Sequence, residues 1–430
     1  MMERGPYPQN WIRFGLQKKK EFLQDTSRLF DGLIVPANIL FYQYKATPTL
    51  VWMCKDRLFC VDPMSYLLGR PIEALVGRLG ELKPSLRKLI ERGHGLSADG
   101  FSPTAFLRTL QDASDNSIED FVLRVLAVQR TFTWESFKEY AASYVPLGAE
   151  SEALFRPDFL IAPYFYSDAS ACADLNERIR RAAPERYDGV PVYPAIHIPK
   201  SALSDGVGLG ALGDKFLGVA VWVDDFDERT ASRDQIVSLG RLVQSLEERG
   251  NGKGKRIVAS MYGGYFTMTL YHFGLTAVSH GTLFSESRRH MTSAAKGGPA
   301  PVRYYIRQLH QFYPLDVAIR LCEKRDDLLC NCGACRRIVA GDPRRIALYA
   351  ENEALAEAHF LFNRFQEKKF IGDRLIEDIL RDFELNANIY SEISEITKMY
   401  RGRYGLEERS VAGVDHLEKW RQALTELSGV

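Results

Sequence analysis

Three cysteines and one histidine form the most distinctive group of chemically capable residues in the chain. Cys330, Cys332 and Cys335 fall within six residues, and His359 follows in a stretch with helical spacing. Thiolate and imidazole are ligands that zinc prefers, and a structural zinc ion with four protein ligands has no open position for water or substrate. We therefore expect a structural Zn²⁺ site that holds the fold and takes no part in the reaction.

The alternative interpretation of this cluster is a set of free or disulfide-prone cysteines beside an unrelated histidine. The chain has seven cysteines, an odd number, and the other four are scattered in apolar surroundings: Cys54, Cys60, Cys172 and Cys322. No apolar N-terminal segment precedes a cleavage site, and no apolar run reaches membrane-spanning length. We expect a soluble, cytoplasmic protein without a membrane partner, and in that compartment clustered cysteines favour metal over disulfides.

Aspartates that follow apolar, strand-like runs are the candidates for catalysis. Asp62 ends Leu-Phe-Cys-Val-Asp, Asp168 follows Phe-Leu-Ile-Ala-Pro-Tyr-Phe-Tyr-Ser, and Asp224 ends Gly-Val-Ala-Val-Trp-Val-Asp. Any one of them is more often a turn or helix-capping residue. Three carboxylates at strand ends nevertheless predict convergence on one mouth, so Asp62, Asp224 and Asp168 are the candidate catalytic residues.

Five further residues are candidates for substrate contacts. His197 lies in Pro-Ala-Ile-His-Ile-Pro, where a packed core histidine is the commoner role. Tyr262, Gly263 and Gly264 follow an apolar run; paired glycines let a backbone approach a planar ligand, and the alternative is a tight strand-to-helix turn. His280 ends the next run, shortly before Arg288 in a stretch suited to phosphate contacts.

The order of apolar runs predicts the fold class. Short strand-like runs alternate with longer amphipathic stretches, which is typical of a parallel sheet with crossover helices. Their number favours a (β/α)8 TIM barrel, with its chemistry at the carboxyl ends of the strands, over an open doubly wound sheet. The strand candidates are 32–36, 58–62, 159–164, 192–198, 216–223, 256–261 and 277–280, with 49–53 as a further candidate.

The barrel is expected to span residues 1–320, with a helical insertion at about 70–150. A zinc-binding subdomain and the C-terminal helices that complete the barrel are expected over 321–430. The glycine-rich stretch 205–213 precedes a strand instead of following one, so it reads as a connection and not as a phosphate cradle.

The composition is that of an ordinary globular protein with a sizeable core. Of 430 residues, 46% are hydrophobic, and 56 basic side chains nearly balance 55 acidic ones. A nucleic-acid surface must therefore come from local clusters of charge. Three basic pairs lie inside or next to the cysteine and histidine segment: Arg336-Arg337, Arg344-Arg345 and Lys368-Lys369.

These motifs resemble one known family. Cys330-x-Cys332-x-x-Cys335, a spacer of 23 residues and His359, followed by Phe-Leu-Phe-Asn-Arg, is similar to the zinc motif of the tRNA-guanine transglycosylase superfamily. The stretch from Gly263-Gly264 through Phe273-Gly274 to Ser279-His280-Gly281 resembles that family's last barrel unit. The resemblance covers roughly residues 155 to 380 and implies a (β/α)8 barrel with a zinc subdomain near its end.

The resemblance also implies an activity. The family exchanges guanine in a nucleic acid for a 7-deazaguanine base, with one carboxylate as nucleophile and another as acid/base; Asp62 and Asp224 are the matching candidates here. The family's nucleophilic aspartate is replaced by Ser279 or His280. We expect DNA as the substrate in preference to tRNA, and a base such as 7-cyano-7-deazaguanine as the base that is inserted. A partner protein is a further candidate for binding. The alternatives are a tRNA-acting enzyme, a non-catalytic nucleic-acid-binding partner subunit, or a hydrolase of free nucleosides.

Overall fold

The computed structural model describes most of the chain. The described residues are 5–15, 22, 25–77, 80–140, 151–166, 170–203, 215–248, 256–282, 286–288, 301–403 and 415–429. Asp168 and the glycine-rich stretch 205–213 lie outside them. In the described residues, no helix is both long and apolar enough to cross a membrane.

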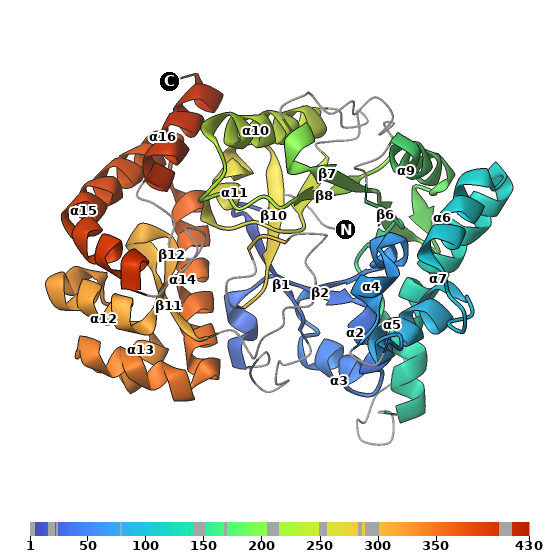
Figure 1. The fold of residues 1–430 in the computed structure, drawn as a ribbon, viewed down its shortest axis with the longest axis horizontal. Coiled ribbons are helices and arrows are strands. Elements are labelled where there is room, and N and C mark those ends of the chain that lie inside the picture. Colours follow the sequence, from blue (N-terminus) through green and yellow to red (C-terminus); the bar gives the residue numbers. More distant parts are fainter. Residues whose placement is uncertain are drawn as a thin grey trace.

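A curled sheet of seven parallel strands occupies the centre of the fold, in the order β3-β2-β1-β10-β9-β8-β7 (Figure 1). Its strands are buried along nearly their whole length, as expected for a parallel sheet covered on both faces. The expectation of an α/β protein with a parallel sheet is confirmed. The strands are β1 (Gln9–Arg13), β2 (Gly32–Pro36), β3 (Leu58–Asp62), β7 (Ala195–Pro199), β8 (Gly218–Asp224), β9 (Ile257–Ser260) and β10 (Leu275–His280).

A second, three-stranded sheet, in the order β4-β6-β5, lies beside β3. Its strands are β4 (Leu160–Ile161), β5 (Arg186–Tyr187) and β6 (Val190–Tyr193), and β4 pairs with β6 in parallel. The backbone N–H of Asp158, just before β4, donates to the carbonyl of Phe59 at 2.8 Å, which joins this sheet to β3. At its other end β6 continues through Pro194 into β7.

One predicted strand is wrong, and one strand of the seven-stranded parallel sheet was missed. Residues 49–53 belong to α3 (Ala46–Met53), because an apolar run of this length fits a buried helical turn as well as a strand. The missed strand is β1, whose polar start, Gln-Asn, hides the buried run that follows. Strand β1 pairs with both β2 and β10, so the first and last strands of the parallel sheet are neighbours.

The region between β3 and β4 is helical, and it shares an apolar core with β4, β6 and the helix over residues 170–182. It contains α4 (Ile72–Leu75), α5 (Pro84–Lys88), α6 (Pro103–Asp112), α7 (Asp115–Tyr140) and α8 (Ser151–Leu154). The remaining helices around the sheet are α2 (Ala37–Tyr42), α9 (Ser170–Ala182), α10 (Arg233–Glu248) and α11 (Tyr265–Thr269).

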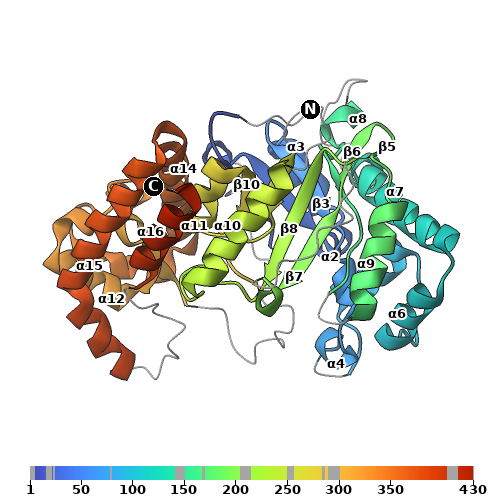
Figure 2. The ribbon, with the colours of Figure 1, turned by 90° about the horizontal axis from the view of Figure 1, so that it is seen from above.

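The last third of the chain forms a mainly helical unit on the opposite side of the sheet from α6 and α7 (Figure 1). It begins with the antiparallel pair β11 (Arg303–Ile306) and β12 (Gln311–Pro314). Helix α16 returns to pack against α10 (Figure 2). The helices of this unit are α12 (Leu315–Lys324), α13 (Gly333–Ile338), α14 (Glu353–Asp373), α15 (Ile376–Arg403) and α16 (Asp415–Ser428).

Short 3₁₀ turns and one π turn complete the described structure. The 3₁₀ turns are Ser27–Leu29, Ser65–Gly69, Lys200–Ala202, Leu270–Phe273, Arg307–Leu309, Asp326–Leu328 and Pro343–Glu351, and the π turn is Leu89–Gly93.

Candidate functional site

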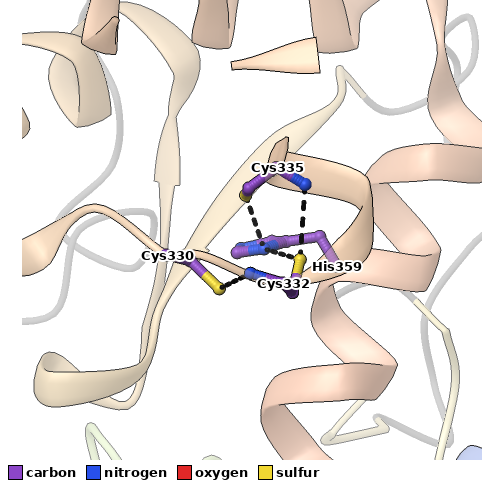
Figure 3. A group of neighbouring side chains, drawn as sticks. All are labelled: Cys330, Cys332, Cys335 and His359. Carbon is purple, nitrogen blue, oxygen red and sulfur yellow. Dashed lines mark hydrogen bonds between the residues drawn. The ribbon is translucent and has the colours of Figure 1, made fainter. Parts of the chain in front are cut away.

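The three cysteines and the histidine meet in space, as the sequence predicted (Figure 3). One potential ligand atom from each lies within 4.8 Å of the others. His359 Nδ1 is 3.5 Å from the Sγ of Cys332 and 3.3 Å from the Sγ of Cys335. Sulfur and nitrogen bound tetrahedrally to one zinc ion lie about 3.5 Å apart, given the usual metal–ligand distances. The four side chains therefore fit a metal site of the zinc type.

Neighbouring groups hold these ligands in place. His359 Nε2 lies 2.8 Å from the carbonyl oxygen of Tyr305, which assigns the ring proton to Nε2 and leaves the Nδ1 lone pair facing the thiols. The backbone N–H of Cys332 donates to the Sγ of Cys330, and that of Cys335 to the Sγ of Cys332, both at 3.4 Å. Such N–H donors stabilise thiolates, so the backbone is arranged for charged sulfur.

The position of the cluster favours a structural role. Cys332 and Cys335 lie at the start of α13 and His359 on α14, all at most 1% exposed, while Cys330 is half-buried. A shell filled by these side chains leaves no position for a substrate. The cluster is therefore not a candidate for substrate binding.

A second polar group surrounds Asp62 at the carboxyl end of β3. Asp62 is fully buried, and its Oδ1 accepts hydrogen bonds from the Tyr164 hydroxyl and the Met64 backbone N–H, both at 3.0 Å. Arg13, at the end of β1, forms a buried ion pair with Oδ2. Burial alone would lower the pKa of Arg13, but Tyr262 and Asp62 raise it, so the guanidinium stays charged. The Asp62 carboxylate is thus fixed in orientation.

Aromatic rings form a wall beside this ion pair. The Arg13 guanidinium lies 4.6 Å from the centre of the Tyr262 ring, and Trp222 lies 5.5 Å from Tyr262. Tyr66 contacts Trp222 at 4.8 Å and Tyr164 at 5.5 Å between ring centres. Tyr66, Tyr164 and Tyr262 follow β3, β4 and β9, and Trp222 lies two residues before the end of β8, so the strands bring the four rings to one edge.

Asp224 lies near the same wall, together with two further arginines. Arg288 donates from Nη1 to the Tyr262 hydroxyl at 3.0 Å, and its carbonyl accepts from the N–H of Asp225 at 2.9 Å. Burial lowers the pKa of Arg70, and Arg288 adds to this shift, whereas Tyr66 and Asp224 oppose it. The four side chains are therefore close enough to interact electrostatically. Guanidinium groups beside aromatic rings can bind an anion next to a planar group.

The two predicted histidines differ in their surroundings. His197, which is 4% exposed, packs between Tyr166 and Trp222 at 4.7 and 4.4 Å, and so borders the aromatic wall. His280 is fully buried, its ring nitrogens lie 2.6 Å from oxygens of Asn10 and Gly281, and burial lowers its pKa to about 3. Both nitrogens of His280 are therefore engaged within the protein.

The paired glycines meet other parts of the protein closely. A Cβ on Gly263 would lie 2.6 Å from Thr267, and one on Gly264 would lie 2.6 Å from Glu228. Glu228 accepts hydrogen bonds from the backbone N–H groups of Gly264, Phe266 and Thr267, and so caps the start of α11. The two glycines therefore form the tight turn between β9 and α11.

Sequence reasoning overlooked Arg13, Tyr66, Tyr164 and Trp222 at this site. Arg13 ends the run Trp-Ile-Arg, which resembles the runs that ended in the predicted aspartates. Tyr164 and Trp222 lie inside predicted strands, where an apolar core role is the default expectation. The available signal was therefore the position at a strand end, not the residue type.

Comparison with known proteins identifies no family for this chain. No family model matches it, and no curated protein is significantly similar. Among solved structures, it is similar to a crystal structure of a probable tagatose 6 phosphate kinase from Sinorhizobium meliloti 1021. That similarity covers 98% of each chain at 10% sequence identity and a TM-score of 0.30, values too low to support an argument about fold or activity.

Proposed function

We propose that the chain is a nucleic-acid guanine transglycosylase, which exchanges guanine for a 7-deazaguanine base, with DNA as the preferred polymer. The observation that carries this proposal is the grouping of the buried Asp62–Arg13 pair with the aromatic wall of Tyr66, Trp222 and Tyr262. A fixed carboxylate beside a wall of aromatic rings suits a reaction at the sugar carbon of a nucleotide whose base is held by the rings.

The proposed mechanism uses two carboxylates. Asp62 attacks the sugar carbon C1′ as the bond to guanine breaks, and Asp224, in its protonated form, gives the departing base a proton. The incoming base then loses a proton to Asp224 and displaces Asp62 from C1′, which restores both groups. Arg13 at Oδ2 and Tyr164 at Oδ1 orient the Asp62 carboxylate, and Oδ1, which accepts only neutral hydrogen bonds, is proposed to make the attack.

The arginines are proposed to bind the phosphates of the polymer. Arg288 and Arg70 lie near the aromatic wall and Asp224. Guanidinium groups bind phosphate oxygens through paired hydrogen bonds. For a duplex, turning guanine out of the stack costs on the order of a few kcal/mol, which phosphate and ring contacts must offset.

The architecture proposed for this activity is a (β/α)8 barrel. The join between β3 and β4 through Asp158, the parallel pairing of β4 with β6, and the continuation of β6 into β7 support it. Together with the seven-stranded sheet, these links suggest a closed ring of strands. Zn²⁺ in the cysteine and histidine site would clamp the adjoining subdomain, and this role rests on the donor set.

The test is to incubate the protein with guanine-containing DNA, with tRNA and with labelled 7-cyano-7-deazaguanine. We expect label to enter DNA, and Asp62→Asn and Asp224→Asn to reduce incorporation at least about a hundredfold while the protein remains folded. Asp327→Asn, at an exposed pair with Arg325, is the matched control and should retain full activity. Label entering tRNA but not DNA would refute the DNA assignment and favour the tRNA-acting alternative.

A second candidate is a non-catalytic, nucleic-acid-binding partner subunit. The observation that favours it is the complete burial of Asp62, whose oxygens accept three hydrogen bonds from the protein. In this role the arginines bind phosphates and the aspartates are structural. Unchanged base modification in both aspartate variants would support it over catalysis.

A further inference from the structure

Helix α14 carries two sets of side chains with different partners. His359 and Asn363, four residues apart, face the cysteines, and the Asn363 amide donates to the Sγ of Cys330 at 3.6 Å. Phe360, one position after the metal ligand, packs instead against His280 at the end of β10, with ring centres 5.2 Å apart. The same helix therefore contacts the metal site and the sheet.

The sheet-facing side of α14 also contacts the segment after β10. The Thr282 hydroxyl donates to Glu357 Oε1 at 3.0 Å, and both residues are buried. Further along the helix, Arg364 forms an ion pair with Glu286; Arg364 is fully buried and Glu286 is 6% exposed. Breaking a buried pair of this kind leaves an uncompensated charge, so the pair holds Glu286 against α14.

Glu286 lies two residues before Arg288, which belongs to the candidate active site. Arg288 itself contacts the aromatic wall and the end of β8. Its guanidinium donates to the Tyr262 hydroxyl at 3.0 Å, and its carbonyl accepts from the Asp225 N–H at 2.9 Å. The described residues 286–288 are therefore attached to α14 at one end and to the aromatic wall at the other.

We propose that Arg364 is a positioning residue which, through Glu286, sets the place of Arg288 at the aromatic wall. Zn²⁺ bound by the cysteines and His359 would fix α14, and its binding would then be transmitted along this helix to the strand-end site. The proposal rests on the proposed function only for the identity of what Arg288 binds, an anionic group of the polymer. The structural link itself is independent of the reaction.

The link can be observed without any activity. The chain has five tryptophans, so protein labelled with 5-fluorotryptophan gives five fluorine resonances to follow by NMR: Trp11, Trp52, Trp134, Trp222 and Trp420. Trp222 packs against Tyr262, which Arg288 contacts, and Trp222→Phe assigns its resonance. Trp52 on α3 and Trp134 on α7 serve as internal references.

At pH 8 we expect Glu286→Gln and Arg364→Lys to shift or broaden the Trp222 resonance while Trp52 and Trp134 stay unchanged. The matched control is Arg344→Lys, at the exposed Arg344–Glu323 pair of the same unit, which should move none of the five. An unmoved Trp222 resonance in folded Glu286→Gln protein overturns the proposal. If Arg364→Lys fails to fold, the result for Glu286→Gln alone tests the proposal, because this substitution keeps the size of the side chain.

Addition of Zn²⁺ to metal-free protein tests the second half of the proposal. One equivalent should move the Trp222 resonance in the wild-type protein, and the movement should be at least halved in Glu286→Gln. Equal movement in both proteins refutes the route through Glu286.

If base exchange is observed, Glu286→Gln should raise KM for the polymer about tenfold with kcat changed less than twofold, because Arg288 is assigned to binding. An equal loss in kcat with unchanged KM would contradict that assignment. A wild-type protein without exchange activity refutes the proposed function, whereas the fluorine measurements still decide the positioning role.

Discussion

The cysteine and histidine cluster and the strand-end site are built in opposite ways. The cluster takes its four ligands from a loop and two helices within one stretch of about thirty residues, and three of them are almost adjacent. The strand-end site combines residues from five strands, each within the last three residues of its strand or just after it: Arg13, Asp62, Tyr164, Trp222 and Tyr262. A site whose residues are close in sequence can be predicted from their spacing. A site whose residues come from distant strands can be recognised only once the topology of the sheet is known.

The two sites also depend on different forces. Metal–ligand bonds can supply folding free energy directly. A buried ion pair such as Arg13–Asp62 adds little net stability but is costly to break, because the remaining charge stays buried. Removing a ligand from the cluster should therefore lower stability through lost metal bonds, and breaking the strand-end pair should lower it less, through the charge that stays buried.

The largest effect on stability is expected from Cys335→Ser. It should reduce the zinc content from one equivalent to nearly none and lower the free energy of unfolding by about 5 kcal/mol or more, since structural zinc contributes on the order of 10 kcal/mol in small zinc domains. Elemental analysis and thermal unfolding measure the two quantities. Cys54→Ser, at a buried cysteine outside the cluster, is the control and should keep its zinc. A full equivalent of zinc in Cys335→Ser would show that the cluster is not the metal site.

Breaking the buried pair at the strand ends should come next. We expect Arg13→Gln to lower the free energy of unfolding by about 3 to 5 kcal/mol, because Asp62 is left buried without its partner. Adding Asp62→Asn should recover part of the loss, and urea unfolding of the three variants tests this. Arg421→Gln, at a half-exposed pair with Glu418, should change stability by less than about 1 kcal/mol. An equally small change in Arg13→Gln would contradict the cost expected for leaving Asp62 buried without its partner.

The pH dependence of stability tests the group that joins the two sites. Burial raises the pKa of Glu286 to about 7 from its ordinary 4.5, with Arg364 and Arg229 opposing the shift and Glu228 and Asp227 adding to it. A carboxyl with a raised pKa in the folded state loses its stabilising contribution as pH rises through that value.

Relative to Glu286→Gln, the wild-type protein should therefore lose about 3 kcal/mol of unfolding free energy as pH rises from 4.5 to above 7. Urea unfolding of both proteins across this range measures the difference, and their comparison cancels effects common to both. A difference that grows in favour of the wild-type protein with rising pH would mean that Arg364 outweighs the cost of burying the charge.

The smallest effect is expected from Tyr262→Phe. The change removes the hydroxyl that accepts the Arg288 hydrogen bond but keeps the ring beside Trp222. We expect a loss of about 1 kcal/mol in polymer binding, or roughly fivefold in Kd, measured by fluorescence anisotropy with a labelled oligonucleotide. Tyr42→Phe, at an exposed tyrosine on α2, should bind as the wild-type protein does. Equal binding by Tyr262→Phe would argue that Arg288 is positioned without this contact.

The sequence predicted the local features well. The cluster of Cys330, Cys332, Cys335 and His359 followed from ligand type and spacing, and residues 32–36 and 58–62 are strands with the predicted bounds. In each case the chemistry or the apolar run lies within one short stretch. Such patterns need no knowledge of the partner elements.

The convergent features required the fold. Arg13 and Asp62 are 49 residues apart, and Tyr164 and Asp62 are 102 residues apart, so nothing in their spacing marks them as partners. Missing β1 removed Arg13 from consideration, because an arginine at the end of an unrecognised strand looks like a surface residue. The burial of His280 by α14 was likewise invisible, since Phe360 lies far along the chain.

Trapping the covalent intermediate tests the central claim most directly. The protein is incubated with a guanine-containing DNA oligonucleotide, denatured during turnover, digested and analysed by mass spectrometry. We predict a sugar-linked DNA adduct on the peptide that contains Asp62, and no adduct in Asp62→Asn. Exchange of the labelled base with the adduct on another residue, or with full activity in Asp62→Asn, would contradict the assignment of Asp62 as nucleophile.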